Sequence, residues 1–259
     1  MLSDQLFLRY QRQISLAEVD HIGQQKLINA RILMVGCGGL GCVVAPYLVG
    51  AGIGSLIIAD GDELEIHNLH RQVIYREEQL GGNKAELLAQ HLRLLNSNGR
   101  IRTVPRQVDE LILTLEIDQV DLVIDCSDNL ATRHAINRVC FNAQVPLISG
   151  AAIGWEGYLM AFRYQQNSPC YHCIVPDMSE RQRCSDSGVI GPVVGMVGNA
   201  QALLVLHYLL DNTRFPAEQL MRFNGMQMQW QTLQLHQDKS CPVCGIHSAV
   251  IKIKECAQC

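Results

Sequence analysis

Four glycines have the spacing of a phosphate-binding turn, between an apolar run at residues 31–35 and an apolar stretch that continues to residue 54. They are Gly36, Gly38, Gly39 and Gly41. In a strand-turn-helix unit, this Gly-x-Gly-x-x-Gly spacing lets backbone amides and a helix N-terminus approach a phosphate. Asp60 ends the next apolar run, where an acidic side chain would hold ribose hydroxyls. The pattern predicts an adenine nucleotide and alone favours NAD, although such a glycine cluster can also serve only as a tight turn.

The polar residues that follow Asp60 shift this prediction from NAD to ATP. They are Asp62, Asn68, His70, Arg71 and Gln72, with Lys84 at the start of the next predicted helix. A triphosphate attacked by a carboxylate brings several negative charges together, and fixed cations must offset their repulsion. The planar guanidinium of Arg71 and the point charge of Lys84 suit phosphates, while Asn68 can donate neutral hydrogen bonds. The alternative is that Arg71 and Lys84 are ordinary surface charges.

Two well-separated Cys-x-x-Cys pairs predict a metal site. The pairs are Cys170 with Cys173, and Cys241 with Cys244. Four thiolates from two such pairs form a tetrahedral zinc site, and a closed all-cysteine site leaves no coordination position for substrate. We therefore expect Zn²⁺ in a structural role that staples the C-terminal strands to the domain. Unliganded thiols or a redox pair are the alternative.

Cys184 is a separate candidate, because it stands outside both pairs in a polar stretch with Arg181 and Arg183 nearby. Cationic neighbours lower the pKa of a thiol and favour the nucleophilic thiolate. A third pair, Cys256 and Cys259, ends the chain and could bind metal, relay sulfur or have no role. The other cysteines fall in or beside apolar segments and are interpreted as small buried hydrophobic residues. They are Cys37, Cys42, Cys126 and Cys140.

The elements that must position these residues alternate between strands and helices. Short apolar runs at 31–35, 55–60, 120–126 and 145–149 predict strands, and the segments at 83–96 and 131–143 have helical periodicity. This alternation predicts an α/β fold with a Rossmann-like, doubly wound, mostly parallel sheet. After residue 150 the runs at 157–164 and 220–235 predict antiparallel strands, the second turning at an Asn-Gly pair, in a zinc-stapled extension.

Composition excludes several other classes of protein. The chain has 259 residues and a net charge of −4, which gives no electrostatic basis for binding nucleic acid or an anionic membrane. We expect no membrane span, since no stretch reaches roughly 18 consecutive apolar residues, and the first residues lack the features of a signal peptide. We therefore expect a cytoplasmic protein, in which the 11 cysteines serve metal binding or catalysis rather than disulfides.

Five motifs in order resemble the signature of the ThiF/MoeB/HesA family, which are relatives of ubiquitin-activating enzymes. The motifs are RYQRQ, GCGGLG, DGDELEIHNLHRQ, GGNKAE and DCSDN. The resemblance implies a homodimer that uses ATP to adenylylate the C-terminal Gly-Gly carboxylate of a ubiquitin-like sulfur-carrier protein, with a separate persulfide as sulfur donor. It also implies one such domain at residues 1–245, with a nucleotide-binding core at about 27–150, a carrier-binding and zinc-containing part at 151–245, and a tail at 246–259.

The resemblance assigns roles to particular residues. It implies Asp60 at the ribose, Asn68, Arg71, Gln72 and Lys84 around the phosphates, Arg12 reaching into the partner subunit's site, and Asp128 holding Mg²⁺. Asp62 and Asn129 are expected in the nucleotide site as well. Asp128 fits the metal role because it follows the strand at 120–126, although Asp125 competes for it and Asp128 could instead cap the next helix. Cys184 matches a cysteine implicated in a covalent link to the carrier during sulfur transfer.

The resemblance leaves the carrier open between two pathways. The stretches CIVPD, GVIGPVVG and FNGMQMQWQTLQL resemble ThiF enzymes of thiamine thiazole biosynthesis, whereas SGAAIGWEG resembles MoeB, which activates the small subunit of molybdopterin synthase. We expect the thiamine carrier, ThiS. Alternatives of a different class are an NAD-dependent oxidoreductase and an adaptor that binds the carrier without activating it.

Overall fold

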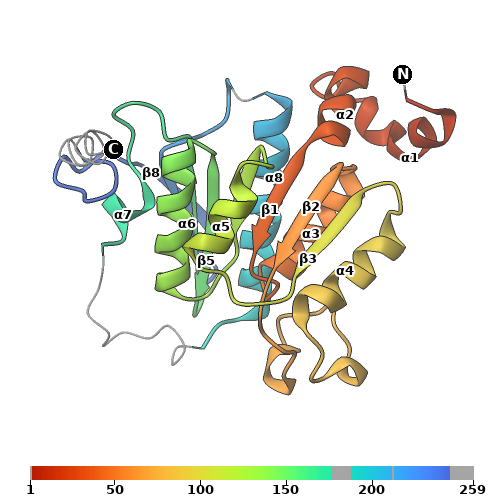
Figure 1. The fold of residues 1–259 in the computed structure, drawn as a ribbon, viewed down its shortest axis with the longest axis horizontal. Helices are drawn as coiled ribbons and strands as arrows, with labels where there is room; N and C mark the ends of the chain where they lie inside the picture. The colour runs from red at the N-terminus through yellow and green to blue at the C-terminus, as the bar shows by residue number, and fades with distance from the viewer. Residues whose placement is uncertain (1, 177–187, 212, 246–259) are drawn as a thin grey trace, which may run out of the picture.

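A computed structural model describes residues 2–176, 188–211 and 213–245 of the chain (Figure 1). One sheet in the order β3-β2-β1-β4-β5-β6-β7-β8 runs through it. Its parallel strands are β1 Arg31–Val35, β2 Ser55–Ala59, β3 Arg100–Val104, β4 Leu122–Asp125 and β5 Leu147–Ile153. The antiparallel strands are β6 Glu156–Phe162, β7 Gln219–Asn224 and β8 Gln229–Gln234. The predicted mixed α/β fold with a mostly parallel sheet is confirmed.

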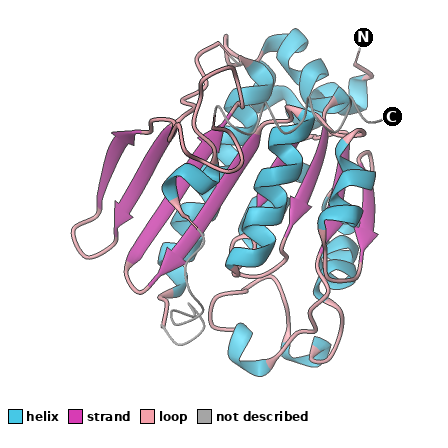
Figure 2. Cartoon of the chain, turned by 60° about the vertical axis from the view of Figure 1, so that its left-hand side comes forward, coloured by secondary structure: helices cyan, strands magenta, loops and turns pink. Residues whose placement is uncertain are grey.

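Helices cover both faces of this sheet (Figure 2). The helices are α1 Asp4–Ile14, α2 Asp20–Asn29, α3 Gly41–Ala51, α4 Lys84–Leu95, α5 Glu110–Ile117, α6 Leu130–Ala143, α7 Tyr171–Ile174 and α8 Gly191–Leu210. Two short 3₁₀ turns, η1 Ile66–Asn68 and η2 Glu77–Gln79, lie between β2 and α4. Because side chains alternate along a strand, Ile32 and Met34 of β1 pack with α3, α4 and α8, whereas Leu33 and Val35 pack with α5 and α6. The sheet therefore has a core on each face.

Local chemistry sets the ends of the helices next to the glycine loop. Helix α3 ends at Ala51 because Gly52 follows in the left-handed conformation, with φ 92°. Helix α4 begins at Lys84 because the side chain of Asn83 accepts a hydrogen bond from the amide of Glu86 at 3.1 Å. The apolar stretch that continues to residue 54 therefore forms a helix only as far as Ala51.

Most predicted strands and helices are confirmed, including the antiparallel pair of the extension that turns after Asn224. Strand β3 was not predicted, because Arg100 and Arg102 break its apolar character and it lies at the edge of the sheet. Helix α8 was not predicted either. By length and composition α8 could cross a membrane, although we expected no segment of that kind from the sequence. In the fold, α8 contacts α3, β5 and β6, and Val193, Val197 and Val205 are buried there, as in a core helix.

Candidate nucleotide site and four-cysteine cluster

Three strand ends meet at the carboxyl edge of the sheet. Val35, the last residue of β1, is paired with Ala59 of β2 on one side and with Asp125 of β4 on the other. The residues that follow each strand therefore start side by side. The chain winds outward in opposite directions from β1 and β4, which makes this edge the switch point where doubly wound sheets bind ligands.

The glycine loop occupies this switch point, and two of its glycines are required by close backbone approaches. Gly36 has φ 98°, and a Cβ atom there would lie 2.5 Å from the carbonyl oxygen of Cys126. A Cβ on Gly41 would lie 2.1 Å from the carbonyl oxygen of Gly36. Helix α3 then begins without a side-chain cap. The loop thus presents an uncapped helix N-terminus, which favours an anion such as phosphate.

Asp60 follows β2 and is tied to the glycine loop. One carboxylate oxygen accepts a hydrogen bond from the amide of Cys37 at 2.6 Å, and the other accepts from the amide of Asp62 at 2.8 Å. Burial raises the pKa of Asp60, and these two amide hydrogen bonds offset part of that rise. The acidic side chain predicted to hold ribose therefore lies at the loop.

Lys84 is a buried cation beside this edge. Its Nζ atom lies 3.1 Å from Oδ2 of Asp62, and the residue is only 6% exposed. The second oxygen of Asp62 accepts a hydrogen bond from Nε2 of Gln107 at 2.7 Å. Because a buried ammonium must be paired, Asp62 serves as the counter-ion of Lys84. Lys84 is therefore no ordinary surface charge.

The segment that contains η1 lies against the glycine loop. A Cβ on Gly38 would lie 3.5 Å from Nε2 of Gln72, and one on Gly39 would lie 3.6 Å from Cγ of Arg71. Gln72 is 2% exposed, and its Oε1 atom has no hydrogen-bond partner within the part of the chain that the structure describes. A buried acceptor without a partner is costly, and a hydrogen-bond donor of a bound ligand would satisfy it.

The head groups of Arg71 and Asn68 are held by this same segment. Nη1 of Arg71 donates to the carbonyl oxygen of His67 at 3.1 Å and lies 2.8 Å from Nε2 of His70. Oδ1 of Asn68 accepts a hydrogen bond from the amide of Glu65 at 3.1 Å, which closes the 3₁₀ turn. The structure thus brings Arg71, Gln72 and Lys84 to the edge where the glycine loop lies.

The two aspartates after β4 have different environments. Asp125 is fully buried, and its carboxylate accepts hydrogen bonds from Ser127 and from the hydroxyl of Ser149. Asp128 is exposed, and its carboxylate has no hydrogen-bond partner among the described residues. Asn129 caps α6 by accepting from the amide of Thr132 at 2.9 Å, so the alternative that Asp128 is the cap is wrong. Of the two, only Asp128 is free to bind a cation.

Arg12 lies at the opposite edge of the sheet. It is exposed in the last turn of α1, which packs on α2, and α2 leads directly into the amino end of β1. Figure 1 shows α1 and α2 together at the end of the sheet from which β1 starts. Within one chain, therefore, the structure does not bring Arg12 to the glycine loop.

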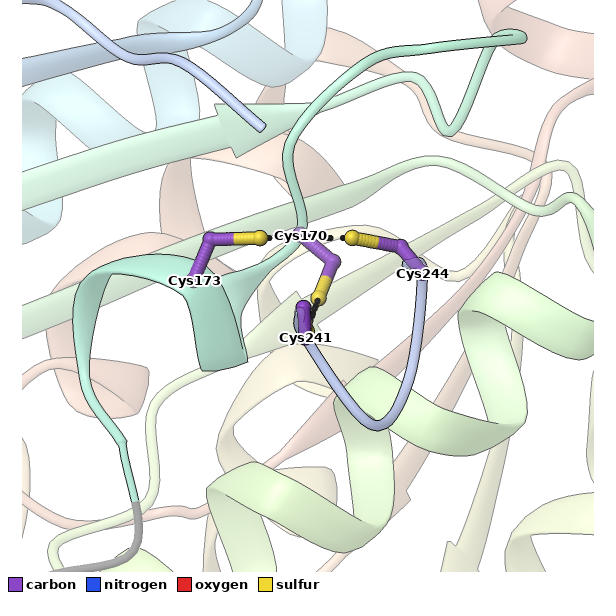
Figure 3. Close-up of side chains that lie close together, drawn as sticks. All are labelled: Cys170, Cys173, Cys241 and Cys244. Atoms are coloured by element: carbon purple, nitrogen blue, oxygen red, sulfur yellow. Dashed lines mark hydrogen bonds between the residues drawn. The ribbon is translucent and has the colours of Figure 1, made fainter. Parts of the chain in front are cut away.

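The four paired cysteines form one cluster (Figure 3). All four Sγ atoms lie within 4.8 Å of one another, with Cys170 3.7 Å from Cys241 and Cys173 3.2 Å from Cys244. Tetrahedral Zn–S bonds of the usual length would separate the sulfurs by about 3.8 Å. Hydrogen bonds within the cluster lower the pKa of the Cys173 thiol and raise the pKa of the Cys170 thiol. The cluster has the donors and the dimensions of a metal site.

The cysteine cluster lies at the other edge from the glycine loop. It joins the segment after β6 to the segment after β8, and both strands end opposite the starts of their neighbours: Phe162 pairs with Leu147, and Gln234 pairs with Gln219. Both connections therefore leave the sheet at the amino edge of the parallel strands. Cys184, Cys256 and Cys259 lie outside the described residues.

Several residues that support the site were not predicted. The hydroxyl of Tyr75 lies 2.8 Å from the carbonyl oxygen of Cys37 and 3.1 Å from that of Lys84, so this buried side chain ties the glycine loop to α4. Gln107 orients Asp62, and Arg133 and Ser149 surround Asp125. Tyr75 and Gln107 lie outside the motifs marked in the sequence, and Arg133 and Ser149 lie in segments that the sequence marked without giving either residue a role.

A comparison with known proteins decides the family, because the chain matches the ThiF family over residues 10–243. The chain belongs to the ThiF family. Relatives that cover nearly the whole ThiF-family domain carry two kinds of name. The "Sulfur carrier protein ThiS adenylyltransferase" of Escherichia coli is 39% identical over 94% of this chain and 97% of its own length. The "Molybdopterin-synthase adenylyltransferase" of Salmonella typhimurium is 38% identical over 94% of this chain and 98% of its own length. The resemblance predicted from sequence is confirmed.

Other relatives place this ThiF-family domain in longer proteins. "Adenylyltransferase and sulfurtransferase MOCS3" of Caenorhabditis briggsae is 41% identical over 92% of this chain, which spans 60% of MOCS3. Among solved structures, E. coli MccB with ATP superposes with a TM-score of 0.78 at 22% identity, covering 92% of this chain and 73% of MccB. At that identity the similarity concerns the fold.

Proposed function

We propose that this chain is an adenylyltransferase that transfers AMP from ATP to the C-terminal carboxylate of a small ubiquitin-like sulfur-carrier protein ending in Gly-Gly. The observation that carries the proposal is the buried Lys84 ammonium, held beside a phosphate-binding glycine loop in a ThiF-family chain. Relatives at 38–39% identity are named adenylyltransferases of sulfur-carrier proteins or of molybdopterin synthase, which supports it. A nicotinamide dinucleotide would need less positive charge at this edge.

The reaction needs positioned charges more than a general base, because the carrier's carboxylate is already ionised near neutral pH. One of its oxygens attacks the α-phosphorus of ATP, the bond from that phosphorus to the bridging oxygen breaks, and pyrophosphate leaves. The carrier becomes an acyl-adenylate. Lys84 and Arg71 would stabilise the negative charge that builds up on the phosphates, and the ammonium of Lys84 would exchange Asp62 for a phosphate oxygen.

Mg²⁺ is the cation we propose to accompany ATP, and Asp128 is its proposed protein ligand. The support is the exposed carboxylate of Asp128, three residues after β4 and at the same edge as the glycine loop, which has no partner among the residues that the structure describes. Hard oxygen ligands and phosphates suit Mg²⁺. When bound, this ion would screen the charge of the phosphates during their displacement.

The cation of the four-cysteine cluster is proposed to be Zn²⁺ in a structural role. Four sulfur ligands suit this ion and leave no position open for substrate. The cluster also lies at the opposite edge from the glycine loop, so its contribution to the reaction would be to hold together the connections that follow β6 and β8.

A homodimer is proposed because Arg12 can serve this reaction only from a second copy of the chain. Its helix α1 lies at the amino edge, remote from the glycine loop of its own chain. A partner subunit that brought its own Arg12 to the phosphates would add a planar guanidinium to the charges of Lys84 and Arg71.

We propose the thiamine carrier ThiS as the substrate, with the small subunit of molybdopterin synthase as the alternative. The stretches that resemble ThiF enzymes support the first, and the 38% identical relative supports the second. In this proposal sulfur then replaces AMP and comes from a separate persulfide donor. A covalent link through Cys184 during that later step stays a prediction.

Exchange of labelled pyrophosphate into ATP tests the proposal. The chain is mixed with ATP, Mg²⁺ and either ThiS or the molybdopterin-synthase small subunit, each with its Gly-Gly end and each without the final glycine. We expect exchange that requires the intact carrier, faster with ThiS. Faster exchange with the molybdopterin carrier would select the alternative pathway, and no exchange with either carrier would contradict adenylylation and favour a non-catalytic adaptor.

A further inference from the structure

A buried ion pair lies next to the turn that carries Asp128. Asp125 ends β4 and Arg133 lies on α6, and their side chains approach to 3.9 Å with both residues buried. The hydroxyl of Ser149 on β5 donates to Oδ2 of Asp125 at 2.7 Å and lies 3.5 Å from Nη1 of Arg133. Three elements of the fold thus meet in one polar network beneath the carboxyl edge.

Most backbone partners of this network belong to the turn after β4. Oδ1 of Asp125 accepts from the amide of Ser127 at 3.0 Å and from its hydroxyl at 2.6 Å. Nη2 of Arg133 donates to the carbonyl oxygen of Ser127 and, at 2.9 Å, to that of Gly150. Both the amide and the carbonyl of Ser127, the residue before Asp128, are therefore held.

The other side of Asp128 is fixed as well. Asn129 caps α6, and Arg133 lies on the next turn of the same helix. On the strand side, Nε2 of Gln201 on α8 donates to the carbonyl oxygen of Asp125 at 3.0 Å. Asp128 is the exposed residue between these two anchored ends, so its backbone has little freedom while its carboxylate faces solvent.

Burying two charges costs free energy that their attraction often only just recovers, so such a pair is weak evidence for stability alone. Here the pair fixes a turn that packs against the phosphate loop. A Cβ on Gly36 would lie 2.5 Å from the carbonyl oxygen of Cys126 and 2.9 Å from the amide of Ser127. A shift of this turn would therefore move Asp128 relative to the glycine loop.

We infer that Arg133 and Asp125, completed by Ser149, are positioning residues that hold the Asp128 carboxylate where the cation that accompanies the nucleotide binds. This inference rests on the proposed function for the identity of the nucleotide. It differs from the usual role of a buried ion pair in the core, because removing the network should weaken cation binding even where the fold survives. Substitution of a residue that orients a metal ligand commonly lowers the affinity for the metal by about 10- to 100-fold.

Binding of Mn²⁺ tests this inference without turnover. Electron paramagnetic resonance would measure free Mn²⁺ in the presence of full-length chain and a non-hydrolysable ATP analogue, for wild type, Arg133→Lys, Ser149→Ala and Asp128→Asn. Arg138→Met is the matched control, since Arg138 lies on the same helix and pairs with Glu110 at the surface. Circular dichroism and thermal melting would verify that each variant is folded.

We expect Arg133→Lys to weaken Mn²⁺ binding by about 10-fold or more, approaching Asp128→Asn, and Ser149→Ala to weaken it by about 3- to 10-fold. The control should match wild type, and affinity for the analogue without metal should change less than threefold in all variants. Wild-type Mn²⁺ affinity in a folded Arg133→Lys protein would overturn the inference. If that variant fails to fold, Ser149→Ala decides in the same way.

The same experiment separates this inference from the proposed function. Failure of wild type to bind the ATP analogue would overturn both. A different outcome is that wild type binds Mn²⁺ and the analogue, and that Arg133→Lys and Ser149→Ala bind Mn²⁺ more weakly, but that no carrier-dependent pyrophosphate exchange occurs. This outcome would overturn the adenylylation proposal and uphold the positioning role.

Discussion

The two edges of the parallel strands carry different chemistry. At the carboxyl edge, strand register brings together the glycine loop, Asp60 and Asp128. Among the residues that the structure describes, Oε1 of the nearby Gln72 has no hydrogen-bond partner, and Asp128 is exposed. At the amino edge, the sulfur atoms of four cysteines converge on one another. The first arrangement leaves positions for a substrate and the second leaves none. The carboxyl edge thus carries the groups that could act on a ligand, and the amino edge carries groups that hold the chain together.

Removal of a cation at the carboxyl edge should have the largest effect on activity. We expect Lys84→Ala and Arg71→Ala to lower carrier-dependent pyrophosphate exchange by about 10²- to 10³-fold with little change in melting temperature, because each would stabilise charge that develops on the phosphates. Arg93→Ala serves as the control, since Arg93 lies on α4 with Lys84 but bonds the carbonyl oxygen of Ile101. Exchange near the wild-type rate in both site variants would refute the argument from charge.

Removal of one cysteine of the cluster at the amino edge should instead lower the stability of the fold. We expect Cys173→Ser to lose bound metal and to reduce the free energy of unfolding by at least about 2 kcal/mol, a fall of about 4–8 °C in melting temperature. The KM for ATP of the protein that remains folded should be unchanged. Elemental analysis and calorimetry would measure this, with Cys140→Ala as the control, a buried cysteine outside the cluster.

A metal-free wild-type protein with the same melting temperature as the metal-loaded protein would contradict the structural role. So would a Cys173→Ser protein that melts normally but no longer binds ATP, because the two edges would then be coupled.

A smaller effect should follow from Asp60→Asn, which changes charge without changing size. We expect the KM for ATP to rise by about 10-fold through loss of a charged hydrogen bond to ribose. Burial raises the pKa of Asp60 in the folded protein, so the native state binds its proton more tightly than the unfolded state does. In wild type this residue therefore disfavours folding as pH rises through that raised pKa.

The pH dependence gives the measurement for this variant. Chemical unfolding at several pH values should show the stability of Asp60→Asn relative to wild type increasing from pH 4 to pH 7, because the substitution removes the cost of the buried charge. A relative stability that is constant or falls over this range would show that the two amide hydrogen bonds outweigh burial.

Much of the nucleotide edge could be predicted from sequence, because its residues follow strands with strong apolar patterns. The glycine loop and Asp60 directly follow such runs, and Lys84 begins a segment with helical periodicity. The relation between Asp125 and Asp128 could not be predicted, since it depends on Arg133 and Ser149, which come from other elements. Strand β3 and helix α8 were missed because an edge strand with arginines and an apolar helix rich in glycine and valine both lack clear periodicity.

Adenylylation of a carrier carboxylate would leave a covalent product of defined mass. Intact-mass spectrometry of a Gly-Gly-ended sulfur carrier, incubated with the chain, ATP and Mg²⁺ under acidic quench, tests it most directly. We predict a carrier species heavier by one AMP group, absent without ATP, absent for a carrier that lacks its final glycine, and strongly reduced for Lys84→Ala. An unmodified carrier in the presence of folded protein that binds NAD but not ATP would show that the chain is not an adenylyltransferase.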